Sequence, residues 1–262
     1  MPEMPEVEQV RKTLLPHIKG KTIKNIEINL ARLIKYPSPE EFIAGLTGKT
    51  ILDVGRRGKY LVLKTGENQK LIVHLRMTGS LIAQDADKPE PPYAKIKFEL
   101  TDGVTMWFCD IRTFGTLYLV TNNDAYIAGY ETLGPERPVI AKSRKPIKTL
   151  ILEQTFIAGL GNIYADECLA LSGILPMRTA NTLTDEEIDR LHDAINKVIA
   201  QGIANRGTTF RDYKDGEGNK GDNQNHLLVY GRKGLCCKMC GGELLGTKVG
   251  GRGTTYCPHC QK

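Results

Sequence analysis

The sequence predicts an α+β protein with more than one domain. We expect an N-terminal antiparallel β-sandwich with a leading helix, then a helical domain, then a small cysteine-rich β-hairpin. Three observations predict this order: short β-rich runs between residues 22 and 120, helical periodicity after residue 146, and five of the seven cysteines within the last 27 residues. We place the boundaries at residues 1–125, 126–227 and 228–262.

The sandwich is predicted from a change of period early in the chain. Residues 6–18 indicate a helix, since Val7, Val10, Leu14 and Ile18 recur at spacings of three and four. From Thr22 the pattern alternates, first in "TIKNIEINL" and then in short runs such as "KYLVLK", "KLIVHL" and "VTMWFC", punctuated by "GEN", "TDG" and "TNN" turns. Short strands at regular spacing are typical of an antiparallel sandwich or barrel.

The helical domain follows a loop-rich stretch at residues 124–146. We predict helices over 147–155, 162–173 and 184–203, the last opening on a Thr184/Glu187 capping box. Residues 213–226 are polar, glycine-rich and without periodicity, which indicates a surface loop or a substrate lid.

Composition narrows the function classes without choosing one. No apolar run approaches the roughly 18–20 residues of a membrane span, and "MPEMPEVEQVRK" has no signal-peptide pattern. We therefore expect a cytoplasmic protein with no membrane partner. A net charge of +6 permits an anionic partner.

The strongest local motif is C-terminal. Cys237, Cys240, Cys257 and Cys260 form a C-x2-C-x16-C-x2-C pattern, typical of a closed, four-thiolate structural zinc site. Cys236 falls outside the pattern and is left out. Between the pairs, "ELLGTKV" and "GTTYC" flank "GGRG", which predicts a β-hairpin with Arg252 at its tip, suited to a phosphate contact.

Two weaker signals point toward nucleic acid. In "AGLGNIYADE", a glycine-containing turn leads to Asn162 as a predicted helix N-cap, which makes a helix–turn–helix arrangement able to hold an anion. In the β-rich half, basic residues of "GRRGKY" accompany Met77, Arg112 and Phe114. One cation and two bulky apolar side chains can fill the hole left by a flipped base.

These motifs occur in one order along the whole chain. "MPEMPEVE", "RRGKYL", "HLRMTG", "DIRTFG", "EQTFIAGLGNIYADE", "VYGR" and the "CKMC…GGRGTTYCPHCQK" finger together resemble the bacterial formamidopyrimidine-DNA glycosylases, which are related to endonuclease VIII. The resemblance implies a helix–two-turn–helix domain, one structural zinc ion, a monomer, and double-stranded DNA with oxidised bases or abasic sites as the partner. It implies base excision with AP lyase activity.

The resemblance also implies roles for residues. Pro2 would be the nucleophile once Met1 is removed, Glu3 would handle protons, and Glu6 would support them or only start the helix. Lys59 would belong to the catalytic residues and contact a phosphate at the lesion. The other residues expected to contact DNA are Lys148, Asn162 and Arg252 at phosphates or near the substrate, and Met77, Arg112 and Phe114 in the void, with Arg112 facing the orphaned cytosine. The 213–226 loop would close over the flipped base.

The chain departs from the family pattern at two places. Tyr93 stands where the family often has histidines, and Thr113 replaces a basic residue after Arg112. Two alternatives stay open: an endonuclease VIII-type enzyme for oxidised pyrimidines, and a non-catalytic zinc-dependent DNA-binding protein. The full Met77/Arg112/Phe114 set favours purines, and Pro2 with Glu3 argues against a pure binder.

Overall fold

The computed structural model describes residues 2–134 and 143–262. The chain divides into two compact units, one made of Met1–Glu131 with Asn205–Asp222, the other of Thr132–Ala204 with Asn223–Lys262. The predicted loop-rich boundary lies partly outside the described residues. The segment at residues 205–222 packs with the first unit, whereas the sequence assigns it to the helical domain.

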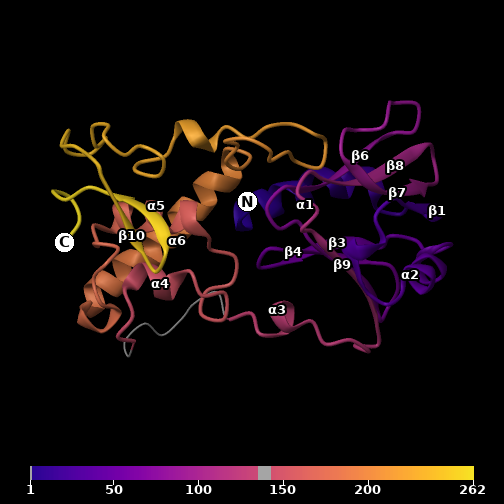
Figure 1. The fold of residues 1–262 in the computed structure, drawn as a ribbon, viewed down its shortest axis with the longest axis horizontal. Helices are drawn as coiled ribbons and strands as arrows, with labels where there is room; N and C mark the ends of the chain where they lie inside the picture. Colours follow the sequence, from indigo (N-terminus) through magenta and orange to yellow (C-terminus); the bar gives the residue numbers. More distant parts are fainter. Residues whose placement is uncertain (1, 135–142) are drawn as a thin grey trace. The chain divides into compact units, whose positions relative to one another are not determined.

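The first unit contains two sheets, visible in Figure 1 among the strands of the N-terminal half. Their strands are β1 (Ile23–Ile28), β2 (Ile34–Tyr36), β3 (Asp53–Arg57), β4 (Tyr60–Lys64), β5 (Gln69–His74), β6 (Gly79–Asp85), β7 (Ala94–Leu100), β8 (Val104–Asp110) and β9 (Thr116–Thr121). One sheet has the order β1-β7-β8-β6 and the other β2-β9-β5-β4-β3. All pairings are antiparallel except that of β2 with β9, which is parallel.

Both sheets and α1 (Met4–Ile18) contribute to one hydrophobic core. The four apolar residues that predicted the helix, Val7, Val10, Leu14 and Ile18, are fully buried. They meet inward-facing residues of both sheets, among them Leu61 of β4 and Phe98 of β7. Alternation along β7 is complete, with every second residue buried, as a sheet with one covered face requires.

Two short helices complete the first unit. The helix α2 (Pro39–Leu46) has Ser38 as its N-cap and buries Phe42 and Leu46. The Oγ of Ser38 accepts from Glu41 N–H in a capping box. The helix α3 (Ala128–Glu131) places Tyr130 beside Tyr60, with ring centroids 5.4 Å apart. The sequence analysis predicted neither helix.

The polar segment after residue 204 is fastened to this unit. Gly216 N–H donates to Thr13 Oγ1 of α1 at 2.8 Å, and Gly216 O accepts from Ala83 N–H of β6 at 2.9 Å. Asp215 is 1% exposed and accepts from Arg206 Nη2 at 3.0 Å. The first part of the predicted 213–226 loop is therefore an ordered structure with its own anchors.

The described part of the second unit contains the helices α4 (Ile147–Ile151), α5 (Asn162–Ser172) and α6 (Asp185–Ala204). The α6 capping box is as predicted, with Glu187 N–H donating to Thr184 Oγ1 and Thr184 N–H to Glu187 Oε2. A Cβ at Gly202 of α6 would come within 2.6 Å of Tyr164 of α5, so glycine permits the two helices to pack closely.

The predicted helix over 147–155 ends early. Gln154 Nε2 donates to the carbonyls of Leu152 and Leu160 at 2.9 and 2.8 Å, and its Oε1 accepts from Gly159 N–H at 3.1 Å. These bonds turn the chain instead of continuing α4. Asn162 is the first residue of α5 and Gly161 is the N-cap, so the predicted Asn162 cap is displaced by one residue.

The C-terminal hairpin pairs β10 (Leu245–Val249) with β11 (Arg252–Tyr256). Its two-residue turn is Gly250-Gly251, with φ of 55° and 74°, values that glycine adopts without strain. The finger is joined to the residues that follow α5, because Gln261 Nε2 donates to Ile174 O at 2.8 Å and Lys262 N–H to Gly173 O at 3.0 Å. Across the described part of the chain, no helix combines the length and apolar character of a membrane span.

Candidate active site and nucleic-acid interface

The start of α1 holds the predicted nucleophile and its carboxylates. Pro2 is buried, and Glu3 and Glu6 are 2% and 1% exposed. Glu3 is the N-cap and forms a reciprocal capping box with Glu6, in which Glu6 Oε2 accepts from Glu3 N–H at 2.8 Å. The positive end of the helix dipole favours carboxylates in this first turn.

Glu6 also fixes the segment that follows α6. Its Oε1 accepts from Thr208 N–H at 2.7 Å, and Tyr213 OH donates to Glu6 O at 3.3 Å. Burial, followed by the neighbouring Glu6 carboxylate, raises the pKa of Tyr213, so its hydroxyl stays protonated and able to donate. One carboxylate therefore ties the backbone beside Pro2 to a residue 202 positions away in the chain.

Lys59 lies in the two-residue turn between β3 and β4, after Gly58 with φ 55°. The side chain of Arg56 holds this turn, with Nη1 donating to Gly58 O at 2.9 Å and Nε pairing with Glu8 of α1 at 3.1 Å. Burial disfavours the charged Glu8 carboxyl, but hydrogen bonds from Arg11 and Arg56 outweigh it and hold the pKa of Glu8 below its ordinary value. The turn is thereby fastened to the helix that carries Glu3.

His74, at the end of β5, is a buried imidazole that the sequence analysis did not single out. Burial, then the charges of Arg76 and Lys59, lowers the pKa of His74 to about 3. Its Nδ1 accepts from Arg76 N–H at 2.9 Å, so the neutral ring carries its proton on Nε2. The charges of Lys59 and Arg76 therefore add to the effect of burial in keeping the His74 ring neutral.

The three predicted void-filling residues lie in one exposed place. Met77 is 39% and Phe114 50% exposed, and Arg112 Cζ lies 4.8 Å from the centroid of the Phe114 ring. Met77 and Phe114 line a groove of about 460 Å³ whose other walls include Arg32, Lys35 and Arg76. Arg32 donates to Thr113 Oγ1, so a cation from another element lies at the position where the basic residue is missing. Tyr93, the other departure, is exposed.

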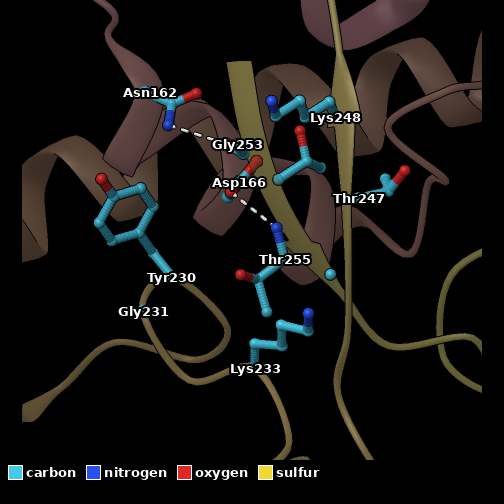
Figure 2. A pocket seen from close by; sticks show the side chains of 11 residues that line it. Asn162, Asp166, Tyr230, Gly231, Lys233, Thr247, Lys248, Gly253 and Thr255 are labelled. Atoms are coloured by element: carbon cyan, nitrogen blue, oxygen red, sulfur yellow. Dashed lines mark hydrogen bonds between the residues drawn. The ribbon is translucent and has the colours of Figure 1, made fainter. Parts of the chain in front are cut away.

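In the second unit, Asn162 and the finger hairpin meet directly (Figure 2). Asn162 Nδ2 donates to Gly253 O at 3.0 Å, next to the exposed Arg252. An amide carries two N–H donors, and this contact uses one of them. Asn162 and the neighbour of Arg252, Gly253, line a pocket of about 650 Å³, which Lys233 and Lys248 also line.

Lys148 has an internal position. Its ammonium is fully buried, pairs with Asp166 Oδ1 at 2.6 Å and donates to Gly253 O at 2.9 Å and Thr254 Oγ1 at 2.7 Å. Burial raises the pKa of Asp166 to about 6, against the opposing charge of Lys148. All three ammonium donors have partners within the protein, which argues against the predicted contact of Lys148 with DNA.

Acidic residues of α5 hold the segments around this pocket. Asp166 Oδ2 accepts from Thr255 N–H of β11 at 3.1 Å. Glu167 is 3% exposed and accepts from the N–H groups of Leu228, Val229 and Tyr230 at 2.6, 2.9 and 2.8 Å. The sequence analysis missed both residues, although their acidic pair in "YADE" on an otherwise buried helix was a readable signal.

The four predicted zinc ligands converge. The Sγ atoms of Cys237, Cys240, Cys257 and Cys260 all lie within 4.8 Å of one another. The Cys237–Cys260 and Cys240–Cys257 Sγ distances are 3.9 and 3.5 Å. Tetrahedral zinc–thiolate bonds of about 2.3 Å place sulfurs about 3.8 Å apart, so this donor set fits one structural zinc ion.

Comparison with known proteins assigns the family. Family models match residues 1–117 (formamidopyrimidine-DNA glycosylase N-terminal domain), 134–214 (its H2TH domain) and 234–262 (zinc finger found in FPG and IleRS). A formamidopyrimidine-DNA glycosylase of Heliobacterium modesticaldum is 45% identical over 277 residues, covering 100% of both chains. The chain belongs to the formamidopyrimidine-DNA glycosylase family.

Solved structures of formamidopyrimidine-DNA glycosylases share its fold. A point mutant of the Lactococcus lactis FPG, in complex with a Fapy-dG containing DNA, matches with a TM-score of 0.90 and 38% identity over 100% of both chains. MutM in complex with carbocyclic 8-oxo-G containing DNA matches with a TM-score of 0.89 and 38% identity over 100% of both chains. The predicted fold class and family resemblance are confirmed, whereas the roles of individual site residues stay predictions.

Proposed function

We propose that the chain removes oxidised purines, 8-oxoguanine and formamidopyrimidines, from duplex DNA and then cleaves the strand by β,δ-elimination. The observation that carries this proposal is the buried start of α1, where Pro2 adjoins Glu3 and Glu6 fixes the Glu3 backbone. The family assignment and the DNA-bound neighbours support the substrate class.

The first step uses the two residues at the start of the chain. Removal of Met1 makes Pro2 a secondary amine, and an α-amino group with a pKa of about 7.7–8.0 is partly unprotonated near neutral pH. The lone pair attacks the sugar C1′ and the bond from C1′ to the damaged base breaks, and the base leaves with the proton that the Pro2 nitrogen loses. Glu3 protonates the ring oxygen as the sugar opens, which leaves an iminium ion between Pro2 and C1′.

The iminium ion then drives strand cleavage. Its positive charge acidifies the C2′ proton, and loss of that proton expels the 3′ phosphate. A second elimination expels the 5′ phosphate, and water releases the sugar fragment from Pro2. The product is a gapped strand, and every electron pair ends on a leaving group or on the iminium nitrogen.

The remaining residues hold the DNA. Met77, Arg112 and Phe114 fill the space of the flipped base, with Arg112 facing the cytosine, while Lys59 binds a phosphate at the lesion. In the second unit, Asn162 and Arg252 grip the backbone, and zinc stabilises the hairpin that carries Arg252. In this proposal the 213–226 loop covers the flipped base, and its backbone is anchored at Gly216, Gly221 and Asp222. We infer that the protein acts as a monomer in the cytoplasm.

Borohydride trapping tests the chemistry. We expect mature protein beginning at Pro2 to become covalently fixed to DNA containing 8-oxoguanine, because reduction converts the iminium ion to a stable amine. Protein extended before Pro2 should trap nothing, since an amide nitrogen has its lone pair delocalised. Glu3→Gln should lose base excision but still trap on a preformed abasic site. Full excision by protein shown by mass to retain Met1 would disprove the mechanism.

The same experiment separates the alternatives. A non-catalytic zinc-dependent binder would retain DNA without any trapped product. An endonuclease VIII-type enzyme would trap faster on oxidised pyrimidines than on 8-oxoguanine. We favour purines because the chain has the complete Met77/Arg112/Phe114 set, in which Met77 and Phe114 line one groove and Arg112 lies over the Phe114 ring.

A further inference from the structure

A buried carboxylate lies directly beneath the Met77/Arg112/Phe114 set. Asp110 is the last residue of β8 and is 1% exposed. Its Oδ1 accepts from Thr78 Oγ1 at 2.6 Å and from Arg112 N–H at 3.2 Å, and its Oδ2 accepts from Gly115 N–H at 2.8 Å. Thr78 Oγ1 in turn accepts from Arg112 N–H at 2.9 Å.

These bonds join two separate loops at the residues beside the void-filling side chains. Thr78 follows Met77, Gly115 follows Phe114, and Arg112 is held by its own backbone N–H. The Asp110 carboxylate thus binds Arg112 itself and the residues that follow Met77 and Phe114. Asp110 and Thr78 together bridge the 75–79 loop and the 110–115 loop.

The surrounding backbone leaves little freedom. A Cβ at Gly79 would come within 2.4 Å of Leu75 O, and a Cβ at Gly115 would come within 2.4 Å of Phe108 Cζ. Arg76 and Thr113 have φ of 56° and 55°, a region that non-glycine residues rarely adopt. A strained backbone conformation persists only where the surrounding contacts hold it in place. The hydrogen bonds to Asp110 are among those contacts.

Asp110 is not a counter-ion. Among the ion pairs of the described residues none includes Asp110, and its partners are one hydroxyl and two backbone amides. A buried carboxylate that accepts hydrogen bonds from neutral donors binds those donors strongly. A side chain that presents an N–H group at the same position would leave the donors without an acceptor. Its chemistry therefore suits fixing loop geometry.

We propose that Asp110 is a positioning residue that locks the 75–79 and 110–115 loops together, so that Met77, Arg112 and Phe114 enter the duplex as one preformed unit. This inference rests on the proposed function. Asp110 does not touch DNA or the reacting atoms. Because it restricts the two loops before DNA binds, the three side chains lose less conformational entropy on binding.

The test compares base excision with cleavage at a preformed abasic site in the same duplex under single-turnover conditions. Asp110→Asn keeps the shape of the side chain but turns one acceptor oxygen into a donor that faces N–H groups. We expect excision of 8-oxoguanine opposite cytosine to fall at least about tenfold, and abasic-site cleavage to stay within about twofold. In a second duplex, with 2-aminopurine in place of that cytosine, the fluorescence increase caused by unstacking of 2-aminopurine on binding should be lost.

Two further variants keep the test decisive. Thr78→Val removes one hydroxyl with little change in volume and should lower excision in the same direction by a smaller factor, even where Asp110→Asn folds poorly. Asp102→Asn, an exposed carboxylate in the β7–β8 turn that pairs with Lys21, is the matched control and should match the wild type.

The outcomes separate this inference from the proposed function. Wild-type excision by folded Asp110→Asn, or by Thr78→Val where Asp110→Asn does not fold, overturns the inference, as does an equal loss on lesion and abasic DNA. If Met77→Ala and Phe114→Ala also excise normally, the void-filling role itself is wrong. If those two variants lose excision while Asp110→Asn does not, only the positioning role fails.

Discussion

Single residues in this protein connect distant parts of the chain. Glu6 accepts from Glu3 and from Thr208, and Asp110 joins the two loops around Thr78 and Gly115. The sequence predicted Glu3 and Glu6 from their motif, although both are buried. It did not predict Asp110 or Thr208 as partners, because a long-range hydrogen bond leaves no periodic pattern in the sequence.

His74 gives a pH prediction at the same scale. Its pKa is about 3 in the folded protein, against an ordinary value of 6.5. The unfolded chain therefore binds a proton that the folded chain does not, and the contribution of neutral His74 is present above pH 6.5 and lost as pH falls toward 3. We expect the free energy of unfolding to fall by up to about 1.4 kcal/mol per pH unit from this group.

Urea unfolding between about pH 7 and pH 4, within the window where His74 differs in protonation, measures this slope. Trp107, the one tryptophan of the chain, lies in β8 and reports on the first unit. In His74→Gln, the free energy of unfolding should depend less steeply on pH, by the amount that corresponds to about one bound proton. His226→Gln, which removes an exposed imidazole of the second unit, is the matched control. An unchanged slope in His74→Gln would contradict the buried neutral state.

At the scale of elements, periodicity predicted the long helices and the alternating strands well. It overextended α4, because side-chain bonds from Gln154 turn the chain after Ile151. It missed α2, although Ser38, Pro39 and Glu41 form a readable capping signal, because the helix is only 8 residues long. The parallel β2–β9 pair could not be read, since strand pairing depends on tertiary packing.

The finger hairpin carries a prediction about DNA grip. Arg252 begins β11 directly after the Gly250-Gly251 turn, and the adjacent Gly253 O is held by Asn162 and Lys148. A phosphate contact by this arginine carries no sequence information. Arg252→Ala should therefore weaken binding to damaged and undamaged duplexes alike and reduce the slope of log K against log salt by about 0.9.

Fluorescence anisotropy at several salt concentrations measures both effects. Lys197→Ala, which removes an exposed cation of α6, is the matched control and should keep the wild-type slope. A loss confined to one lesion, or an unchanged salt slope, would count against a phosphate role for Arg252.

At the scale of the whole molecule, the order of the structural regions along the chain could be predicted from the sequence. The way in which they group into two compact units could not. The sequence placed the β-rich half, the helices and the finger in the observed order. Residues 205–222 join the first unit because Glu6, Thr13 and Ala83 bond their backbone. The finger groups with the helices because Asp166 and Gln261 connect it to α5 and the residues that follow. Both effects depend on contacts between segments far apart in sequence.

We expect the zinc ion to stabilise the C-terminal finger of the second unit. The local core there is small, consisting of Ala170, Val229, Cys237, Leu244 and Cys257, and two of its members are predicted zinc ligands. A module with so little apolar burial depends on its metal for folding. Replacing Cys240 or Cys257 with serine should release zinc, lower the Tm and weaken DNA binding, because the hairpin that presents Arg252 loses its support.

Zinc content per chain, measured with DNA affinity on the same sample, checks this prediction. Cys236→Ser is the matched control, since Cys236 is exposed and lies outside the cluster of four sulfurs. It should keep one zinc ion and bind DNA as the wild type does. If Cys236→Ser loses zinc while Cys237→Ser retains it, the ligand assignment is wrong. If Cys257→Ser loses zinc but keeps full affinity, the finger does not contribute to DNA binding, and the role of Arg252 fails with it.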